Sequence, residues 1–215
     1  MTLAAIDAAA APERLFVSGA FHPRAGDGAP ENCGTLVLLS PAEPGFWPHV
    51  TAAPEFADKS PNPLDRWSAR VIGALARQFA ATPLFPFTGP PWPPFFDWAL
   101  KTGESFRSPV SLLVHHRMGL LASYRGALAL DAVLALPMPP SNPCMGCPAP
   151  CASACPTTAL GRSGYNVAAC HDFLETALGE DCLSLGCGVR RACPLSAAYG
   201  RLPQQSAWHM RQFHK

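Results

Sequence analysis

The sequence predicts an α+β protein of two domains, a mixed helix and sheet domain over residues 1–138 and a small cysteine-rich domain over residues 139–215. Three observations support this prediction. Short apolar runs bounded by glycine and proline, which are typical of strands, share the N-terminal part with one amphipathic helical segment. A proline-rich stretch at 137–143 then marks a boundary. Eight of the nine cysteines follow it, between Cys144 and Cys193.

The first elements of the N-terminal domain follow from hydrophobic periodicity. The Ala-rich residues 2–11 predict a weakly amphipathic helix, and the alternating residues 14–20 predict a strand. Residues 34–40, a short apolar run between glycine and proline, predict a buried strand. A longer helix is expected to begin at Pro63, since proline suits the first helical position. Its apolar residues recur every four positions and are expected to pack in the core: Trp67, Val71, Leu75 and Phe79.

Aromatic and β-prone segments continue this domain toward the boundary. Residues 82–98 hold six prolines and six aromatics, and they predict an ordered loop that packs over the sheet or walls a ligand pocket. Residues 108–116 and 120–130 predict two strands joined by a tight turn. His115 and His116 are expected to point to opposite faces of their strand, because side chains alternate along a strand.

The composition narrows the classes of function. Charged residues make up 14% of the chain and the net charge is +1. A nucleic-acid-binding protein is therefore not expected, because it would carry a basic face. The N-terminal residues lack the basic start of a secretory signal, and the uncharged stretch 132–161 holds too many prolines and cysteines for a membrane span. We therefore expect a cytoplasmic protein with no membrane partner, whose clustered reduced thiols bind metal.

The first cysteine run has a spacing close to that of an iron–sulfur motif. The run C-x2-C-x3-C-x3-C-P comprises Cys144, Cys147, Cys151 and Cys155, and Pro156 follows the last cysteine. The bacterial ferredoxin run, C-x2-C-x2-C-x3-C-P, is one residue shorter. A [4Fe–4S] cluster needs four thiolates, of which a short looping backbone supplies three, while the fourth cysteine of the run serves a neighbouring cluster.

A second group of cysteines completes the number that two such clusters require. It comprises Cys170, Cys182, Cys187 and Cys193, the last again followed by proline. Two [4Fe–4S] clusters are therefore the favoured interpretation. A single cluster, a zinc site and a disulfide framework are the alternatives, although zinc sites usually combine two separate C-x2-C knuckles. Cys33 stands apart and predicts an ordinary thiol. Positive charge from Arg190 and Arg191 would raise the potential of a nearby cluster or dock an acidic electron donor.

The C-terminal part resembles the iron–sulfur domain of the cobalamin-dependent epoxyqueuosine reductase family and of the related reductive dehalogenases. The resemblance rests on CPTTA at 155–159, on ACHDFL at 169–174 and on the later Gly-Cys and Cys-Pro pairs. In that family the first three cysteines of the run share a cluster with the final Cys-Pro.

This resemblance implies a ligand set for each cluster. The first set is Cys144, Cys147, Cys151 and Cys193. The second set is Cys155, Cys170 and Cys187, completed by Cys182. Cys182 is needed because position 190, where the family has a cysteine, is arginine in this chain.

The N-terminal part is similar to the cobalamin-processing (decyanating and dealkylating) proteins. GTLVLLSP at 34–41 matches an early strand, and HHRMGLLASYRG at 115–126 resembles the family's H-P-R-x-G…x-R-G stretch, with His116 in place of the proline. That family has a fold like the flavin-dependent nitroreductases, so the resemblance implies an antiparallel sheet flanked by helices. It also implies a corrinoid or flavin pocket beside four residues: His115, Arg117, Tyr124 and Arg125.

The motifs and the resemblance together predict a redox protein with a ferredoxin-like C-terminal domain. Electrons from a partner protein would enter through two [4Fe–4S] clusters and pass to cobalamin, flavin or a small-molecule substrate on the N-terminal domain, as in an oxidoreductase. The alternative is a non-enzymatic electron carrier whose N-terminal domain holds no ligand. A cavity of several hundred Å³ beside Arg117 and Arg125 would favour the enzyme. The sequence assigns no catalytic residue.

Overall fold

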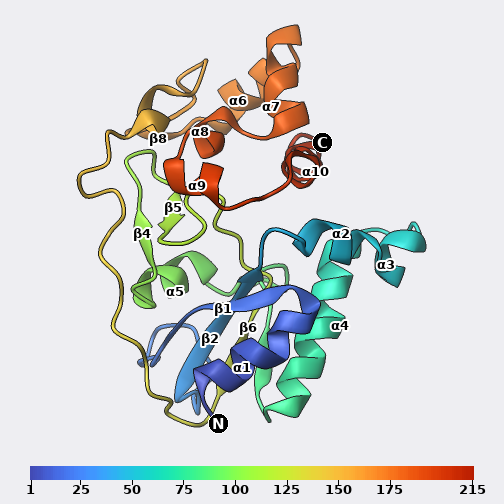
Figure 1. The fold of residues 1–215 in the computed structure, drawn as a ribbon, viewed down its shortest axis with the longest axis vertical. Coiled ribbons are helices and arrows are strands. Elements are labelled where there is room, and N and C mark those ends of the chain that lie inside the picture. The colour runs from blue at the N-terminus through green and yellow to red at the C-terminus, as the bar shows by residue number, and fades with distance from the viewer. The chain divides into compact units, whose positions relative to one another are not determined.

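The computed structural model describes all residues, 1–215, and they form two compact units (Figure 1). The first unit contains Met1–Glu104 and Ser123–Pro140, and the second contains Ser105–Ala122 and Ser141–Lys215. All residues after Pro140 belong to the cysteine-rich unit, and the boundary expected from the sequence lies at residue 138. The division differs from the expected one in one respect, because the segment Ser105–Ala122 belongs to the cysteine-rich unit and not to the sheet domain.

The first unit is built on a four-stranded antiparallel sheet in the order β1-β2-β6-β3. Strand β1 spans Leu15–Phe21, β2 spans Thr35–Pro41, β3 spans Thr82–Leu84 and β6 spans Gly126–Leu130. Every residue of β2 and β6 is buried, as expected for the two central strands of a covered sheet. The α+β class is therefore confirmed, as are the first two expected strands.

Helices α1, α4 and α5 contact strands of this sheet. Helix α4 begins at Pro63, as expected, and buries the apolar side chains of Trp67, Val71 and Leu75. Phe79 follows its last turn as the C-cap residue and is only partly buried. The helices of this unit are α1 (Leu3–Ala10), α2 (Phe46–Thr51), α3 (Pro54–Ala57), α4 (Pro63–Gln78) and α5 (Phe95–Lys101), with a 3-10 turn, η1 (Ala11–Glu13).

The aromatic segment 82–98 is not a loop throughout. It starts with the edge strand β3 and ends in α5, where Phe95 and Trp98 are buried. The Trp98 indole N–H donates a hydrogen bond of 2.7 Å to the Asp27 carbonyl within the same unit. Trp92, in contrast, is 61% exposed. Part of the segment therefore packs in the core of the first unit, which agrees with the expectation that it packs over the sheet.

The predicted hairpin of residues 108–116 and 120–130 is wrong. Strand β5 (Leu113–His115) pairs with β4 (Ser105–Arg107), whereas β6 pairs with β2 and β3 in the first unit. The tight turn does form, and His115 and Gly119 exchange backbone hydrogen bonds of 3.0 and 2.9 Å across it. Gly119 has a φ of 60°, and a Cβ there would collide with the Ser196 backbone, so this turn packs closely inside the second unit.

The second unit consists of short elements joined by turns. Its strands are two or three residues long, and most of its helices have fewer than nine residues. No helix of either unit combines the length and apolar character that a bilayer span requires. Beyond β4 and β5, the elements are η2 (Pro150–Ser153), β7 (Leu160–Gly161), β8 (Gly164–Tyr165), α6 (Val167–Leu174), η3 (Ala177–Gly179), α7 (Glu180–Leu185), α8 (Gly188–Arg191), α9 (Pro194–Ala198) and α10 (Pro203–Phe213).

Candidate metal centre

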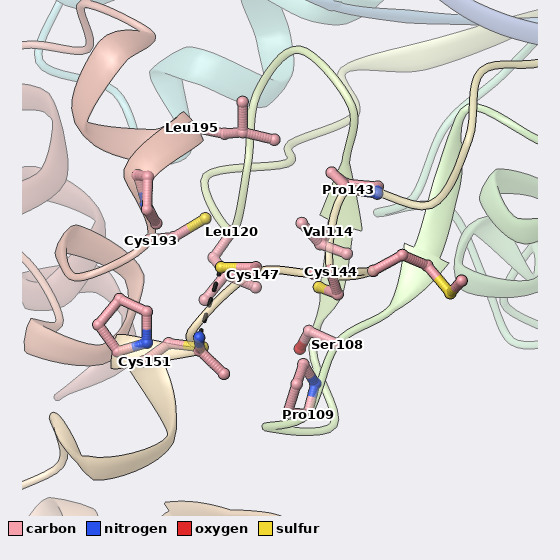
Figure 2. Close-up of a pocket in the computed structure, with 15 residues that line it drawn as sticks. Ser108, Pro109, Val114, Leu120, Pro143, Cys144, Cys147, Cys151, Cys193 and Leu195 are labelled. Atoms are coloured by element: carbon pink, nitrogen blue, oxygen red, sulfur yellow. Dashed lines mark hydrogen bonds between the residues drawn. The ribbon is translucent and has the colours of Figure 1, made fainter.

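Four cysteines of the second unit line one cavity of about 350 Å³, and we call them the first thiol group (Figure 2). Cys193 is the N-cap residue of α9, so it reaches the cavity from a different part of the chain than the cysteine run. The remaining lining is mostly apolar and includes Val114, Leu120 and Leu195. The members of the group are Cys144, Cys147, Cys151 and Cys193.

Local backbone geometry folds the cysteine run around this cavity. Gly146 and Ala149 both have left-handed backbone conformations, with φ of 79° and 51°. The Cys147 N–H donates to the Cys144 carbonyl at 3.3 Å, and the Ala149 N–H donates to the Cys147 sulfur at 3.4 Å (Figure 2). The chain therefore reverses within a few residues, and three cysteines of one short run can line the same cavity.

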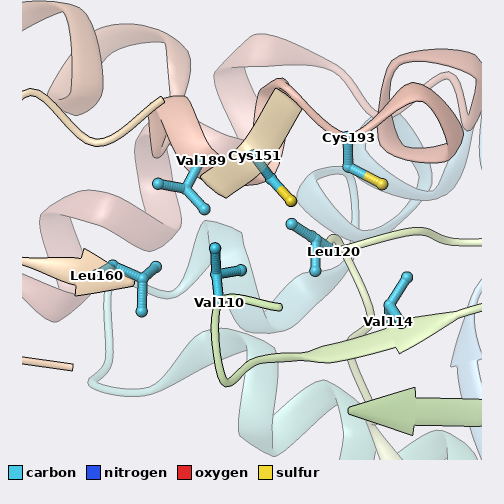
Figure 3. Close-up of a cluster of buried hydrophobic side chains, with 7 residues drawn as sticks. All are labelled: Val110, Val114, Leu120, Cys151, Leu160, Val189 and Cys193. Atoms are coloured by element: carbon cyan, nitrogen blue, oxygen red, sulfur yellow. The ribbon is translucent and has the colours of Figure 1, made fainter. Parts of the chain in front are cut away.

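A buried apolar cluster supports the first thiol group (Figure 3). Cys151 and Cys193 are 6% and 8% exposed and belong to this cluster themselves. The segment 105–122 contributes Val110, Val114 and Leu120 to it. This contribution explains why the segment belongs to the second unit, since its apolar side chains are buried among the cysteines and not in the sheet. The other members are Leu160 and Val189.

Four further cysteines line a second, narrower pocket of about 30 Å³, and we call them the second thiol group. Each comes from a different place in the unit. One precedes β7, one lies on α6, one lies on α7, and one is the N-cap residue of α8. Apolar side chains complete the pocket, among them Leu160, Phe173 and Val189. The members of the group are Cys155, Cys170, Cys182 and Cys187.

The structure brings the eight cysteines together in the same two groups of four that the resemblance implies. Cys182, which the family pattern lacks, lies with the second group. All nine cysteines are free thiols, and Cys33 lies in the first unit, apart from both groups. The cysteine run therefore divides, with its first three members in one group and Cys155 in the other.

Burial and mutual repulsion disfavour the thiolate form in both groups. Burial raises the pKa of Cys144 and of Cys151, and the neighbouring thiols of the same group raise it further. Burial likewise raises the pKa of Cys170 and of Cys182. A bound cation would offset this effect, because a thiol that coordinates a metal is held as its thiolate.

Cys155 is the exception among these thiols. Burial opposes its ionisation, but hydrogen bonds from the backbone of Leu160, Thr157 and Ala159 and from the Thr157 hydroxyl together lower its pKa. The Thr157 Oγ1 lies 3.6 Å from the Cys155 sulfur. The backbone after this cysteine therefore already stabilises a negative charge on the sulfur.

The spacing of the sulfur atoms can be compared with the spacing that a zinc site requires. A tetrahedral zinc site with Zn–S bonds of about 2.3 Å places its sulfurs about 3.8 Å apart. No three of the cysteine sulfurs lie within 4.8 Å of one another. A cluster of several irons spaces its thiolates more widely than one zinc ion does, because each thiolate then binds a different iron.

Two arginines of α8 lie in contrasting surroundings. Arg190 donates from Nη1 to the Leu120 carbonyl at 2.6 Å, and its charge acts on Cys187 and Tyr165. Arg191 forms an ion pair with Asp181 and donates from Nε to the Gly186 carbonyl at 2.8 Å. Arg190 therefore hydrogen-bonds to a residue that lines the first cavity while its charge acts on Cys187. Arg191 and its partner Asp181 act in opposite directions on the pKa of Cys182.

Tyr165 and Thr157 are polar neighbours of the second thiol group that sequence reasoning missed. The Tyr165 hydroxyl hydrogen-bonds to Cys170, which favours the thiolate form of that cysteine. Burial, followed by this hydrogen bond and the nearby thiols, raises the pKa of Tyr165 well above its usual value. Thr157 stands within the CPTTA segment at 155–159 and Tyr165 in no motif, but the sequence does not indicate that either contacts a sulfur, because the folded backbone creates these contacts.

The four residues expected beside a corrinoid or flavin are divided between the units. His115 and Arg117 belong to the second unit, and Tyr124 and Arg125 belong to the first. Arg117 is exposed, and its backbone N–H donates to Nδ1 of the buried His115 at 3.0 Å. The Arg125 guanidinium lies 3.7 Å from Asp65 and donates from Nε to the Tyr124 carbonyl. The two arginines are thus not assigned to a common anion site.

The expectation that His115 and His116 point to opposite faces is wrong. Their ring centroids lie 4.6 Å apart, with 31° between the ring planes. Strand β5 ends at His115, and His116 already belongs to the turn that closes at Gly119. The alternation of side chains along a strand therefore does not apply to this pair.

Comparisons with known proteins gave no match: no family model, no curated protein and no solved structure is significantly similar to this chain.

Proposed function

We propose that the second unit binds two [4Fe–4S] clusters, one at each thiol group, and that the protein transfers electrons. The observation that carries this proposal is the convergence of eight cysteines on two pockets, four at each, from separate elements of the chain. When bound, such clusters supply one-electron transfer without any change in covalent bonding to substrate. The sulfur spacing, which is wider than a zinc ion requires, supports the same assignment.

The residues of the chain have three tasks in this proposal. The eight thiolates hold the irons. The apolar lining of the first cavity, including Val114 and Leu120, excludes water from the site, and exclusion of water influences reduction potential. The donors around Cys155 and Cys170 hold negative charge on their sulfurs.

Anaerobic purification with iron and acid-labile sulfide counts tests this proposal. We expect a brown protein with about eight irons per chain, because two four-iron clusters are expected. Cys151→Ser should selectively reduce the iron at the first site, and Cys182→Ser the iron at the second, whereas Cys33→Ser should retain all of it. A colourless protein that binds zinc even after anaerobic reconstitution with iron and sulfide would refute the proposal.

A cofactor on the first unit, cobalamin or flavin, is a second candidate that would make the protein an oxidoreductase. The observation that favours it is Arg125, whose side chain is only 11% exposed while its nearest carboxylate, on Asp65, lies 3.7 Å away. Burial lowers the pKa of Arg125 and raises that of Asp65, so this pair is incompletely neutralised and could accept an anionic group. Titration with a corrinoid and with a flavin, for the wild type and for Arg125→Gln, tests this candidate. If neither ligand binds the wild type, the protein acts as an electron carrier.

A further inference from the structure

The last turn of α10 forms one wall of the pocket at the second thiol group. Met210 on this turn lines the pocket together with the four cysteines and Tyr165. Phe213 and His214 follow Met210 by three and four positions, so the three side chains share one face of the helix. The His214 N–H donates to the Met210 carbonyl at 2.9 Å, so the helical hydrogen-bond pattern continues to His214.

Phe213 and His214 attach this turn to the neighbours of Cys170. The Phe213 ring stacks on the His171 ring at 4.5 Å and on the Tyr165 ring at 6.1 Å. The Nδ1 atoms of His171 and His214 lie 2.8 Å apart, in a hydrogen bond that one ring donates and the other accepts. His171 follows Cys170 on α6, and Tyr165 lies on β8. Rings from α6, α10 and β8 therefore form one connected group beside the pocket.

The preceding part of α10 is fixed by its packing against α7. Gln205 and Ala207 of α10 are buried. A Cβ at Gly186, which follows α7, would collide with the Ser206 side chain, so the chain approaches closely at this point. Helix α7 carries Cys182. Helix α10 is therefore anchored to the helix that carries one cysteine of the second group, and its last turn is attached to the helix that carries another.

Helix α10 is the one helix lining this pocket that carries no cysteine. Bonds from the cysteines to iron would hold α6, α7 and α8 in place once a cluster is bound. The last turn of α10 can therefore move away without breaking any bond to iron. Its attachment depends on the ring contacts and on the hydrogen bond of His214.

We propose that His171, Phe213 and His214 are positioning residues of the second site, which hold the last turn of α10 closed over the pocket and so slow the loss of iron from it. This inference rests on the proposed function. Iron leaves when the donor atoms of a chelator replace thiolate and sulfide on the metal. The released sulfurs take up protons, and no electron is transferred. A closed wall slows this exchange because the chelator must reach the iron through the pocket.

Anaerobic release of iron to an excess of a coloured ferrous chelator tests the proposal on the full chain, with its iron counted first. The Cys151→Ser background reports the second site, and the Cys182→Ser background reports the first. His214→Ala should speed release from the second site by about two- to tenfold, the range by which one lost hydrogen bond shifts an equilibrium between closed and open forms. Release from the first site should not change.

Three further variants separate the ring contacts from general effects of substitution. His214→Asn should restore most of the slow release, because its amide can still hydrogen-bond to the His171 ring. Phe213→Leu should speed release as well, since it removes the stacking on His171 and Tyr165. Gln212→Ala, at an exposed position of the same turn, is the matched control and should leave both rates unchanged.

Hydrogen exchange of the iron-loaded protein keeps the proposal testable if a single-site background fails to fold, because all eight cysteines are then present. His214→Ala should speed exchange in the last turn of α10 and leave α6 and α7 unchanged. Equal acceleration in α6, α7 and α10 would indicate general destabilisation and overturn the proposal. Unchanged release from the second site in both His214→Ala and Phe213→Leu, or equal acceleration at both sites, also overturns it. A wild-type protein without iron refutes the proposed function itself, whereas full iron with unchanged release refutes only this inference.

Discussion

The two units of this protein differ in what holds them together. The first has a four-stranded sheet and a core of large side chains that are fully buried, among them Ile6, Leu36 and Trp67. The strands of the second unit have only two or three residues. Two of the seven buried residues in its apolar cluster (Figure 3) are cysteines, Cys151 and Cys193.

This difference indicates two sources of stability in one chain. Burial of apolar area can stabilise the first unit without a ligand. In the second unit, metal binding contributes directly to folding when the site does not exist in the unfolded chain. Changes to the metal and changes to the sheet core should therefore affect different units.

The largest expected effect is the loss of the second unit's structure when the proposed clusters are removed. A chelator under anaerobic conditions should abolish amide protection in Ser141–Lys215 and Ser105–Ala122, because eight clustered thiolates lose the positive charge that balances them. Protection of β1, β2 and β6 should remain. Hydrogen exchange followed by mass spectrometry measures both units at once. Retained protection throughout the second unit would show that its fold does not depend on metal.

The converse perturbation is Trp67→Ala in the core of the first unit. Trp67 is fully buried and packs edge-on against Phe46 at 5.5 Å, so its truncation should cost about 3–5 kcal/mol of unfolding free energy. Denaturant unfolding followed in the first unit measures this cost, and the iron content should not change. Trp67→Phe is the control, because the indole N–H has no hydrogen-bond acceptor and its loss should cost much less. Equal costs for the two variants would contradict this account of the core.

A smaller effect is expected from Ser196→Ala in the second unit. The buried Ser196 hydroxyl oxygen accepts a hydrogen bond of 2.8 Å from the Leu120 N–H and so attaches the 105–122 segment to α9. Its loss leaves a buried donor without a partner, at a cost of about 1–3 kcal/mol. Hydrogen exchange at Leu120 should become faster. Ser184→Ala, at an exposed position, is the control, and a comparable acceleration there would argue against a specific role for Ser196.

The smallest effect concerns an exposed ion pair of the first unit. Arg66 donates two hydrogen bonds of 2.7 Å to Asp58, and these, with a hydrogen bond from the Ser60 N–H, lower the pKa of Asp58 from 3.8 to about 2. A carboxylate whose pKa is lowered by folding stabilises the folded state at pH values above the pKa that it has in the unfolded chain. This contribution is lost as the pH falls toward 2.

Asp58→Asn should therefore slightly lower the thermal unfolding temperature of the first unit at neutral pH, and the difference from the wild type should vanish between pH 4 and pH 2. Glu31→Gln, at an exposed position without an ion pair, is the control. A difference that persists at pH 2 would mean that the carboxylate's charge is not the cause.

The sequence predicted correctly those helices and strands whose apolar residues recur at a regular spacing. The strand at Thr35–Pro41 and the helix that starts at Pro63 both follow from apolar residues at the period of their own structure. The hairpin predicted from 108–116 and 120–130 was wrong because each half pairs with a strand elsewhere in the chain. Strand β6 pairs with β2 and β3, which are distant in sequence, whereas β5 pairs with the nearby β4, a partner that the local pattern did not indicate.

At the candidate site, too, the sequence predicted some features and only the fold determined the others. The count and spacing of the cysteines predicted two metal centres, because a ligand's identity is a chemical property of the residue itself, and the structure places these cysteines at two pockets. The sequence placed Arg190 and Arg191 side by side without distinguishing them. Only the fold pairs Arg191 with Asp181 and gives Arg190 the Leu120 carbonyl as its hydrogen-bond acceptor. The fold also attaches the 105–122 segment to the cysteines, through Leu120 and Ser196, which are 76 residues apart in the chain. Contacts over such separations arise from packing, and packing exists only in the folded protein.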